Sequence, residues 1–494
     1  MSVDRMRCHP SIILETLFPA VLVLVFIIMA SVQAWSDLYF AIMAPIPVVL
    51  TMFLYWRWSK TWISFTDEEV VVERDTLFKM KKRIPYSKIA SVNVNRGLVN
   101  RLFGTSRIQI NINSSINAAI PEAVLSFRID IADSIREFLA SRMYGDSAFT
   151  VSADADAETV VSIDWKDVLL HSFFGQSSAQ MLSGLFFLLY SVAQIYLALS
   201  ITGVYGGEGL LSLFVFIGVT VIPSVVILFH YANLKVYRSG DTIYLQHGLI
   251  RTYRTSFKVT KINAVRVRTT FFSRLMHRSF IEAEVVGLSS DSNSKRPILC
   301  LMKDYAEIDR VFSELVPEFL YDREAIPQPT ASKRVLGVKC VLWLVLIGAA
   351  TYVSSLYAER ILASIPSITG YEALLGFTPL IVGALLALAT VLWSVRAYST
   401  RTLSAGEELF TFEIGVVDRQ AVTISYDKVQ IANVVRGPLA RRYGLGVSSV
   451  SLLSSLGGVK IQSGYFDVGE LNRIHETVMD RIRTGKYDYR KASR

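Results

Sequence analysis

The sequence predicts a multi-pass α-helical membrane protein that also carries three small α+β domains. Three observations support this fold class: the composition, the spacing of the apolar segments and an internal repeat. Of the 494 residues, 52% are apolar and 19% are charged, and the mean hydropathy is +0.39. Soluble globular proteins have about 45 to 50% apolar and about 25% charged residues. The composition therefore argues against a purely soluble protein, and the net charge of +9 indicates polar parts with a basic surplus.

Six apolar segments are long enough to span the roughly 30 Å of hydrocarbon in a bilayer. They lie at residues 11–30, 38–56, 179–201, 209–231, 335–357 and 373–395. A short loop joins the two segments of each pair, and long polar stretches separate the pairs. The sequence therefore predicts six transmembrane helices in three hairpins, at residues 11–56, 179–231 and 335–395.

The distribution of charge predicts how these hairpins are oriented. The three hairpin loops are acidic, with Asp37 in the first, Glu208 in the second, and Glu359, Arg360 and Glu372 in the third. Basic residues instead follow each hairpin, at Arg57, Lys235 and Arg396. Cytoplasmic loops are enriched in Lys and Arg. We therefore expect a protein of the cell membrane whose termini and three polar domains are cytoplasmic.

The three polar stretches repeat one sequence pattern, and the copies align without a gap from Asp67, Gly240 and Glu407. A lysine and, thirteen residues later, an arginine coincide in all copies: Lys88, Lys261 and Lys428, and Arg101, Arg274 and Arg441. Apolar and polar residues alternate, which is typical of antiparallel strands with one face in water. An amphipathic helical pattern ends each copy, from Ala132, Asp304 and Asp467. We therefore expect three α+β modules in which antiparallel β-sheets are closed by a C-terminal helix.

The repeats resemble a known family. The segments IPYSKI…GLVNRLFG, FKVTKI…FFSRLMH and ISYDKV…GPLARRYG resemble the second family of bacterial pleckstrin-homology-like (PH-like) domains, and the helix pair before each copy resembles YdbT-type bacterial membrane proteins. The resemblance implies two orthogonal antiparallel sheets closed by a C-terminal helix. It also implies a smaller, single-repeat membrane protein of the same domain family as a partner. His277 stands where the other copies have Gly104 and Gly444, so we expect the turn of the second copy to differ.

The resemblance divides the chain into hairpins, domains and linkers. PH-like domains are expected at residues 57–145, 232–322 and 396–486, and linkers at 146–172 and 323–334. These boundaries place each domain directly after its hairpin.

No constellation of residues indicates an enzyme. The six histidines and three cysteines are scattered, without the paired spacing of a zinc site. The Ser-rich stretch after Gly444 lacks the patterns of a nucleophile elbow and of a phosphate-binding loop. Glu282 and Glu284 share one strand face, which we expect to be solvated. We therefore predict no catalytic residue, no metal ion and no cofactor.

Basic residues are the candidates for binding an anionic leaflet or an acidic partner. They comprise a compact cluster, Lys79, Lys81, Lys82 and Arg83, and the repeated Lys88, Arg101, Lys261, Arg274, Lys428 and Arg441. An anionic leaflet stabilises each nearby cation by about 1 kcal/mol. Alternatively, these side chains cap turns, enforce topology, or pair with Glu68, Asp241 and Glu408. Nucleic acid is not an expected partner, because basic faces tethered to a membrane usually meet lipid.

Two functions are compatible with these features. The first is a non-enzymatic membrane scaffold or adaptor that presents three cytoplasmic PH-like domains to a protein partner or to anionic lipid. For such a protein the resemblance implies a role in export of, or protection against, antibacterial peptides. The alternative is a transporter or exporter subunit with a passage between the hairpins. The near absence of polar residues inside the spans favours the scaffold.

Overall fold

The computed structural model describes residues 3–17, 45–77, 79–112, 122–144, 159–161, 163–202, 207–286, 296–363, 372–454 and 457–485. The chain divides into two compact units. The first comprises Met1–Asn263, His277–Pro317 and Leu453–Gly458, and the second comprises Ala264–Met276, Glu318–Leu452 and Val459–Arg494. The boundaries of the units therefore do not coincide with the boundaries of the sequence repeats.

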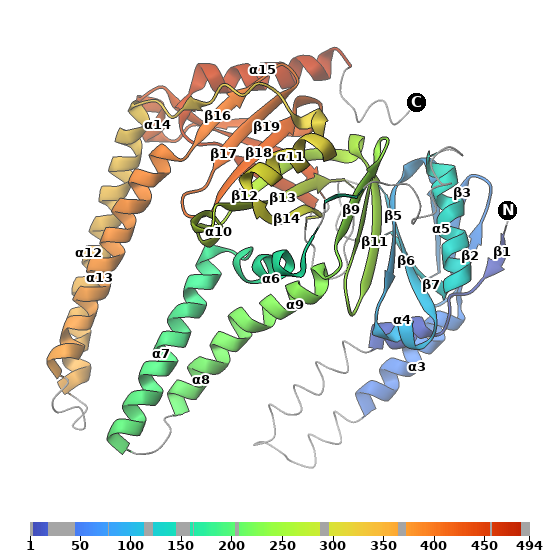
Figure 1. The fold of residues 1–494 in the computed structure, drawn as a ribbon, viewed down its shortest axis with the longest axis horizontal. Coiled ribbons are helices and arrows are strands. Elements are labelled where there is room, and N and C mark those ends of the chain that lie inside the picture. Colours follow the sequence, from blue (N-terminus) through green and yellow to red (C-terminus); the bar gives the residue numbers. More distant parts are fainter. Residues whose placement is uncertain are drawn as a thin grey trace. The chain divides into compact units, whose positions relative to one another are not determined.

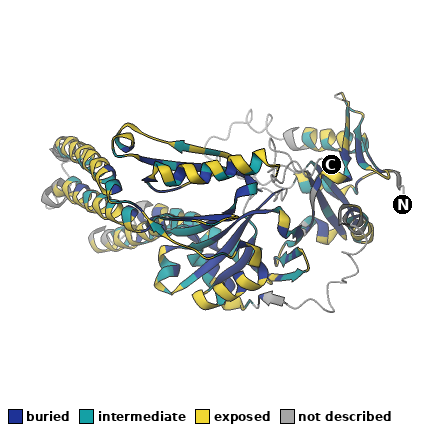
Figure 2. Cartoon of the chain, turned by 90° about the horizontal axis from the view of Figure 1, so that it is seen from above, coloured by how far each residue is buried: buried dark blue, intermediate teal, exposed yellow. Residues whose placement is uncertain are grey.

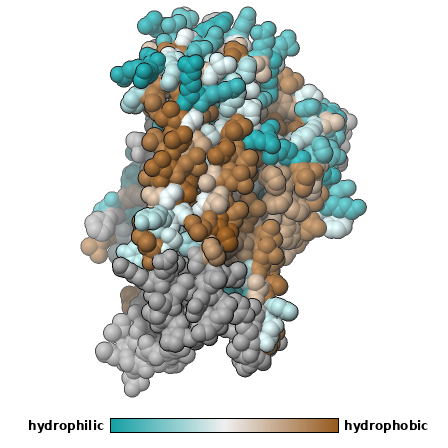
Figure 3. All heavy atoms as spheres, turned by 90° about the vertical axis from the view of Figure 1, so that its left-hand side faces the viewer, coloured by the Kyte–Doolittle hydropathy of each residue, from teal (hydrophilic) through white to brown (hydrophobic). Residues whose placement is uncertain are grey.

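Four helices of the described residues are long and apolar enough to cross a membrane: Ser178–Ser200, Gly209–Tyr231, Ala331–Tyr357 and Phe377–Ser399. In the first unit they are α7 (Ser178–Thr202) and the run of α8 (Gly207–Phe216), the π-helical turn η4 (Ile217–Val221) and α9 (Ile222–Tyr231). In the second unit they are α12 (Ala331–Ala363) and α13 (Glu372–Ser399). On the face of the molecule that carries α12 and α13, Figure 3 shows a band of apolar side chains with polar side chains above it.

The predicted hairpin at 11–56 is described only in part. Its second segment forms α3 (Pro45–Ser59), and residues 18–44 lie outside the described residues. Six spans therefore remain a prediction, of which the structure contains four.

These four spans form two antiparallel pairs (Figure 1). In α7 the Ser191 hydroxyl donates to the carbonyl of Gly209 (2.7 Å), and in α8 the Ser212 hydroxyl donates to that of Phe187 (2.8 Å). In the second unit, a Cβ atom added to Gly383 of α13 would lie 2.2 Å from Oγ1 of Thr351 in α12. Small residues and hydroxyl hydrogen bonds are typical where helices approach closely in a membrane. The pairs lie where the sequence has its second and third pairs of apolar segments.

Each repeat contains two sets of antiparallel strands, a 3-10 turn between the sets and a closing helix. The first repeat has β1 (Val3–Met6), β2 (Thr61–Phe65), β3 (Glu69–Arg74), β4 (Met80–Pro85), η2 (Tyr86–Lys88), β5 (Ile89–Arg96), α4 (Leu98–Leu102), β6 (Thr105–Ile112), β7 (Ala123–Arg128) and α5 (Ile129–Tyr144).

The second repeat has β8 (Thr159–Val161), α6 (Trp165–Phe174), β9 (Lys235–Ser239), β10 (Thr242–His247), β11 (Thr252–Lys258), η5 (Val259–Lys261), β12 (Ile262–Thr269), α10 (Phe271–Leu275), β13 (Arg278–Val285), β14 (Ile298–Asp304), α11 (Tyr305–Leu315) and η6 (Pro317–Phe319). The third has β15 (Ile326–Pro327), β16 (Thr402–Ala405), β17 (Leu409–Ile414), β18 (Arg419–Ser425), η8 (Tyr426–Lys428), β19 (Val429–Val435), α14 (Pro438–Arg442), β20 (Leu445–Ser454), β21 (Gly457–Gln462), β22 (Phe466–Asp467) and α15 (Val468–Arg483).

The sheets join neighbouring repeats. In the first unit, β1 to β4 form one sheet. A second sheet contains strands of the first and second repeats in the order β7-β6-β5-β11-β10-β9-β8, so β5 of the first repeat pairs with β11 of the second. In the second unit, β12 likewise pairs with β18, and β17, β16 and β15 follow in order. A further sheet contains β19, β20 and β21, with β22 paired to β20.

A short strand precedes the helices of every repeat, and the sequence interpretation missed all three. β1, β8 and β15 contain four, three and two residues and pair with β2, β9 and β16, respectively. Strands this short carry no periodic signal. The segments assigned as linkers, 146–172 and 323–334, therefore contain β8, most of α6, and β15.

Backbone hydrogen bonds confirm the ungapped alignment of the copies. The same bond closes the loop before each 3-10 turn: Tyr86 N to Glu68 O (3.0 Å), Val259 N to Asp241 O (2.8 Å) and Tyr426 N to Glu408 O (3.2 Å). The aligned lysines Lys88, Lys261 and Lys428 each end such a turn. The alignment therefore describes equivalent positions in three dimensions.

The buried residues lie between the strands and the closing helices. In the first repeat, Phe65 and Ile108 pack with Leu139 of α5. In the third repeat, Phe410 and Phe412 pack in the same cluster as Leu471 of α15. Figure 2 shows the strands mainly as buried and the long helices mainly as exposed. The antiparallel strands and closing helices of three PH-like domains are thus present as expected.

The turn before the β6 type of strand has the same conformation in all repeats. Its central residue has a left-handed φ of 61° at Gly104, 56° at His277 and 71° at Gly444. The expectation that the turn of the second copy differs is therefore wrong. The following strand needs this conformation at the corner, so His277 adopts it despite its Cβ atom.

We expect His277→Val to lower the free energy of unfolding by about 1 to 3 kcal/mol, because a β-branched residue is strained in this conformation. His277→Gly removes the strain but adds freedom to the unfolded chain, so its net effect should stay within about 1 kcal/mol. Thermal unfolding of the full chain in a mild detergent compares the two variants. Equal unfolding temperatures for valine and glycine would contradict the explanation.

Candidate functional site

The predicted basic cluster comprises Lys79, which precedes the edge strand β4, and three cations of that strand, and each of the four has an acidic partner. The pairs are Lys79 with Asp75 (3.2 Å), Lys81 with Glu73 (2.6 Å), Lys82 with Glu122 (2.7 Å) and Arg83 with Glu69 (3.7 Å). Exposed pairs of this kind each contribute about 0 to 1 kcal/mol. They nevertheless neutralise much of the positive potential that the sequence alone indicates.

The repeated lysines and arginines occupy equivalent positions but different surroundings. Lys88 is exposed, Lys261 is half-buried and Lys428 is 7% exposed. Among the arginines, Arg101 donates to Oγ1 of Thr252 (2.8 Å), Arg274 lies over the ring of Phe271 (5.8 Å), and Arg441 is exposed. The exposure and the partners of the repeated lysines and arginines therefore differ from one repeat to the next.

Lys82 also lines a cavity of about 430 Å³ in the first unit. The cavity lies between the N-terminal segment, the end of α3 and the strands β2, β3, β4, β6 and β7. Its charged lining comprises Glu15, Arg57, Arg74, Lys82, Arg107 and Glu122. Its apolar lining includes Ile12, Leu54, Trp58, Ile63, Val72, Met80 and Leu125. The cavity therefore combines an apolar wall with four cations and two carboxylates.

Two of the four cations have carboxylate partners. Lys82 pairs with Glu122, and Arg107 lies 3.9 Å from Glu15. Glu15 also accepts a hydrogen bond from the Ser126 hydroxyl (2.8 Å). Burial lowers the pKa of Arg107, although the charge of Glu15 opposes this shift. Each of these two pairs thus contributes one cation and one carboxylate to the lining of the cavity.

Arg57 and Arg74 are the other two cations of the lining. Among the described residues, neither has a carboxylate within ion-pair distance. Arg74 makes a long hydrogen bond to Oγ1 of Thr61 (3.4 Å). Burial and then the positive charge of Arg57 lower the pKa of Arg74. An anionic group between the two guanidinium groups would relieve this repulsion, and the planar guanidinium suits phosphate oxygens.

The cavity lies where the chain leaves its apolar segment. Arg57 is in the last turn of α3, and the indole of Trp58 donates to the carbonyl of Cys8 (2.8 Å). Arginine and tryptophan are typical of the boundary between hydrocarbon and water. Burial raises the pKa of the Cys8 thiol to about 11, so this cysteine stays an inert part of the wall.

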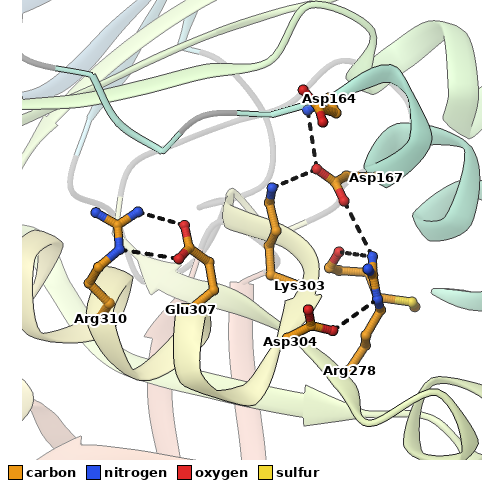
Figure 4. Close-up of polar contacts among 8 residues, drawn as sticks. Asp164, Asp167, Arg278, Lys303, Asp304, Glu307 and Arg310 are labelled. Carbon is orange, nitrogen blue, oxygen red and sulfur yellow. Dashed lines mark hydrogen bonds and ion pairs between the residues drawn. The ribbon is translucent and has the colours of Figure 1, made fainter.

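A second polar cluster attaches α6 to the second domain, and the sequence interpretation missed it (Figure 4). The side chain of Asp167 is 8% exposed and pairs with Lys303 (2.6 Å) and Arg278 (3.3 Å). Asp167 also accepts from the backbone of Asp164 (3.1 Å), which forms a capping box at the start of α6. The sequence signal was the Asp-x-x-Asp spacing before an apolar run.

Glu282 and Glu284 are buried, so the expectation of a solvated strand face is wrong. Glu282 is 8% exposed, and the Glu284 side chain is fully buried. Glu284 accepts hydrogen bonds from Arg296 and from the Ser454 hydroxyl. The segment around Ser454 belongs to the first unit and covers this carboxylate. A buried ion pair of this kind arises only from tertiary contacts.

Long apolar helices and repeated antiparallel domains define a multi-pass membrane protein with repeated α+β modules. The sequence profile described as "Bacterial PH domain" matches residues 15–143, 185–313 and 335–482. The chain belongs to the bacterial PH domain family. It is 21% identical over 322 residues to the transmembrane protein YdbT of Bacillus subtilis (strain 168), which covers 59% of the chain and 63% of that relative. The match thus spans less than two thirds of the relative. No solved structure matches the chain.

Proposed function

We propose that this protein is a non-enzymatic scaffold of the cell membrane that presents three cytoplasmic bacterial PH domains, and that its first domain holds the phosphate of an anionic lipid. The proposal of lipid binding rests on Arg57 and Arg74. Both line one cavity, and neither has a carboxylate partner among the described residues. The apolar wall of the cavity suits the glycerol and the first acyl carbons. Lys82 and Glu122 would contact the polar rim.

The partner and the process of this scaffold are also part of the proposal. A smaller membrane protein with one copy of the same domain, and a role in export of or protection against antibacterial peptides, are supported only by the resemblance of the repeats. The basic residues that follow the spans support the cytoplasmic placement of the domains.

Lipid binding is tested with the full chain in detergent micelles by native mass spectrometry. The probes are short-chain phosphatidylglycerol and the matched phosphatidylcholine. Arg57→Gln combined with Arg74→Gln should weaken phosphatidylglycerol binding by about tenfold or more, because each charged hydrogen bond contributes about 1.5 to 3 kcal/mol.

The matched control is Lys79→Gln combined with Arg83→Gln, which removes the same charge from exposed positions that do not line the cavity. This variant should retain the binding of the unaltered protein. Equal losses in both double variants would indicate diffuse attraction and contradict a defined site. Equal binding of the two lipids by the unaltered protein would contradict the proposal as a whole.

A further inference from the structure

The repeats are joined by strand pairing in one recurring geometry. β5 of the first repeat pairs antiparallel with β11 of the second, and Arg96 lies opposite Thr252. β12 of the second repeat pairs with β18 of the third, and Thr269 lies opposite Arg419. Arg96 and Thr269 are equivalent in the alignment of the copies, and so are Thr252 and Arg419. We call this arrangement the inter-repeat joint, and its register is the same both times.

Two strands of the joint type stand at the ends of their sheets. β4 is equivalent to β11 and β18, and it is the end strand of the first sheet. β19 is equivalent to β5 and β12, and it is the end strand of the sheet that it forms with β20 and β21. In the described part of the chain, β4 and β19 thus each have a neighbouring strand on one side only. The equivalent strands of the other repeats have neighbouring strands on both sides.

Aliphatic side chains of β19 are exposed, whereas the residues at the equivalent positions of β5 and β12 are buried or of another type. Ile431 is 54% exposed, and the equivalent Ala264 is fully buried. Val435 is 53% exposed, and the equivalent Asn95 is 3% exposed. β19 has no charged residue, although charges are the usual protection of an edge strand against pairing. An uncharged, apolar edge is a site for strand addition.

We propose that β19 pairs with β4 of a second copy of this chain in the register of the inter-repeat joint. In that register Val435 lies opposite Met80, Val434 opposite Lys81, Asn433 opposite Lys82, Ala432 opposite Arg83 and Ile431 opposite Ile84. The pairing extends each sheet and covers the exposed aliphatic side chains of β19. It involves neither Arg57 nor Arg74, although Met80 and Lys82 of β4 also line the cavity.

Two of the four cations of the basic cluster, Lys81 and Lys79, have cationic counterparts in the existing joints. Arg254 of β11 occupies the position of Lys81 and is an exposed member of the first joint, opposite Val94. Arg419 of β18 occupies the position of Lys79 in the second joint. A cation at either position therefore does not prevent a joint. The ion pair of Lys81 with Glu73 further reduces repulsion between approaching copies.

The contact is head to tail, because one copy contributes β19 and the next contributes β4. Contacts of this class close into a ring or continue as a chain. We therefore expect assemblies of two or more copies in the membrane.

Disulfide trapping between two full-length proteins tests the register. One protein carries Val434→Cys and the other Lys81→Cys, both with Cys340→Ser, since Cys8 and Cys300 are buried. A fluorescent tag on one protein gives the mixed disulfide a distinct mass. After co-reconstitution in liposomes and mild oxidation, Val434→Cys should cross-link to Lys81→Cys. Asn433→Cys with Lys81→Cys is the control and should not cross-link, because neighbouring strand residues point to opposite faces.

Three outcomes would overturn the proposal: no mixed disulfide, a disulfide between two Val434→Cys chains, or a disulfide that forms only within one chain carrying both cysteines. A second measurement avoids cysteine chemistry. Ile431→Lys should reduce the mass of the detergent-solubilised assembly to that of one chain, as measured by light scattering. Met479→Lys, on the exposed face of α15, should leave it unchanged. An unaltered mass for Ile431→Lys, or a monomeric parent protein, would also reject the inference.

Discussion

Replacing Asp167 by alanine is expected to lower the free energy of unfolding of the first unit by about 3 to 5 kcal/mol, since removal of one partner leaves buried charges uncompensated. Lys303 and Arg278, with 16% and 24% of their side chains exposed, both lose their contact with this carboxylate. The backbone of Asp164 also loses its acceptor at the start of α6. We expect a lower unfolding temperature of the full chain in mild detergent.

Glu307→Ala is the matched control, because the same region contains an exposed pair between Glu307 and Arg310 (2.5 Å; Figure 4). Its removal should cost at most about 1 kcal/mol. Asp167→Asn should have an intermediate effect, since the amide oxygen still accepts from the backbone. If Asp167→Ala and Glu307→Ala unfold at the same temperature, the buried pairs do not stabilise α6 on the domain.

Replacing Arg296 by methionine should have an effect of similar size, about 3 to 5 kcal/mol, because it removes the cation that lies directly on the fully buried carboxylate of Glu284. The Ser454 hydroxyl would remain as a donor. A neutral hydroxyl cannot replace an ionic partner in a site from which water is excluded. The thermal unfolding temperature of the full chain measures the loss.

The double variant Arg296→Met with Glu284→Met separates the ion pair from the packing. Replacement of both buried charges by apolar side chains is often neutral or stabilising. The double variant should therefore recover most of the stability that the single variant loses. If it is as unstable as Arg296→Met alone, the pair acts mainly through its shape and the electrostatic explanation fails.

The sequence was sufficient for the features that depend on local patterns. The equivalence of Lys88, Lys261 and Lys428 follows from an ungapped alignment, and each lysine ends a 3-10 turn in the structure. The apolar segments of α7, α12 and α13 were recognised by length and hydropathy alone. These features are encoded within a few tens of residues, so a single sequence contains their signal.

The candidate site was predicted only in part. The expected cluster contributed Lys82 to the cavity, whereas Arg57 and Arg74 were not among the candidates. Arg57 was counted only as a topological signal. Its proximity to Arg74 arises because β2, which follows α3, pairs with β3 and places Thr61 opposite Arg74, and the sequence does not show this register. The prediction that Glu284 is exposed was wrong because its burial depends on a distant part of the chain, where the Ser454 hydroxyl donates to its carboxylate.

By itself, the sequence determined that this chain has apolar spans and three copies of one α+β module, because hydropathy, strand periodicity and repetition are local properties. Only the tertiary structure decided which strands of neighbouring repeats join, which charges are paired or buried, and which edge of β19 has no neighbouring strand among the described residues. Those outcomes depend on contacts between residues far apart in the chain. One local sequence pattern is compatible with several strand arrangements, and burial and hydrogen bonding select one of them.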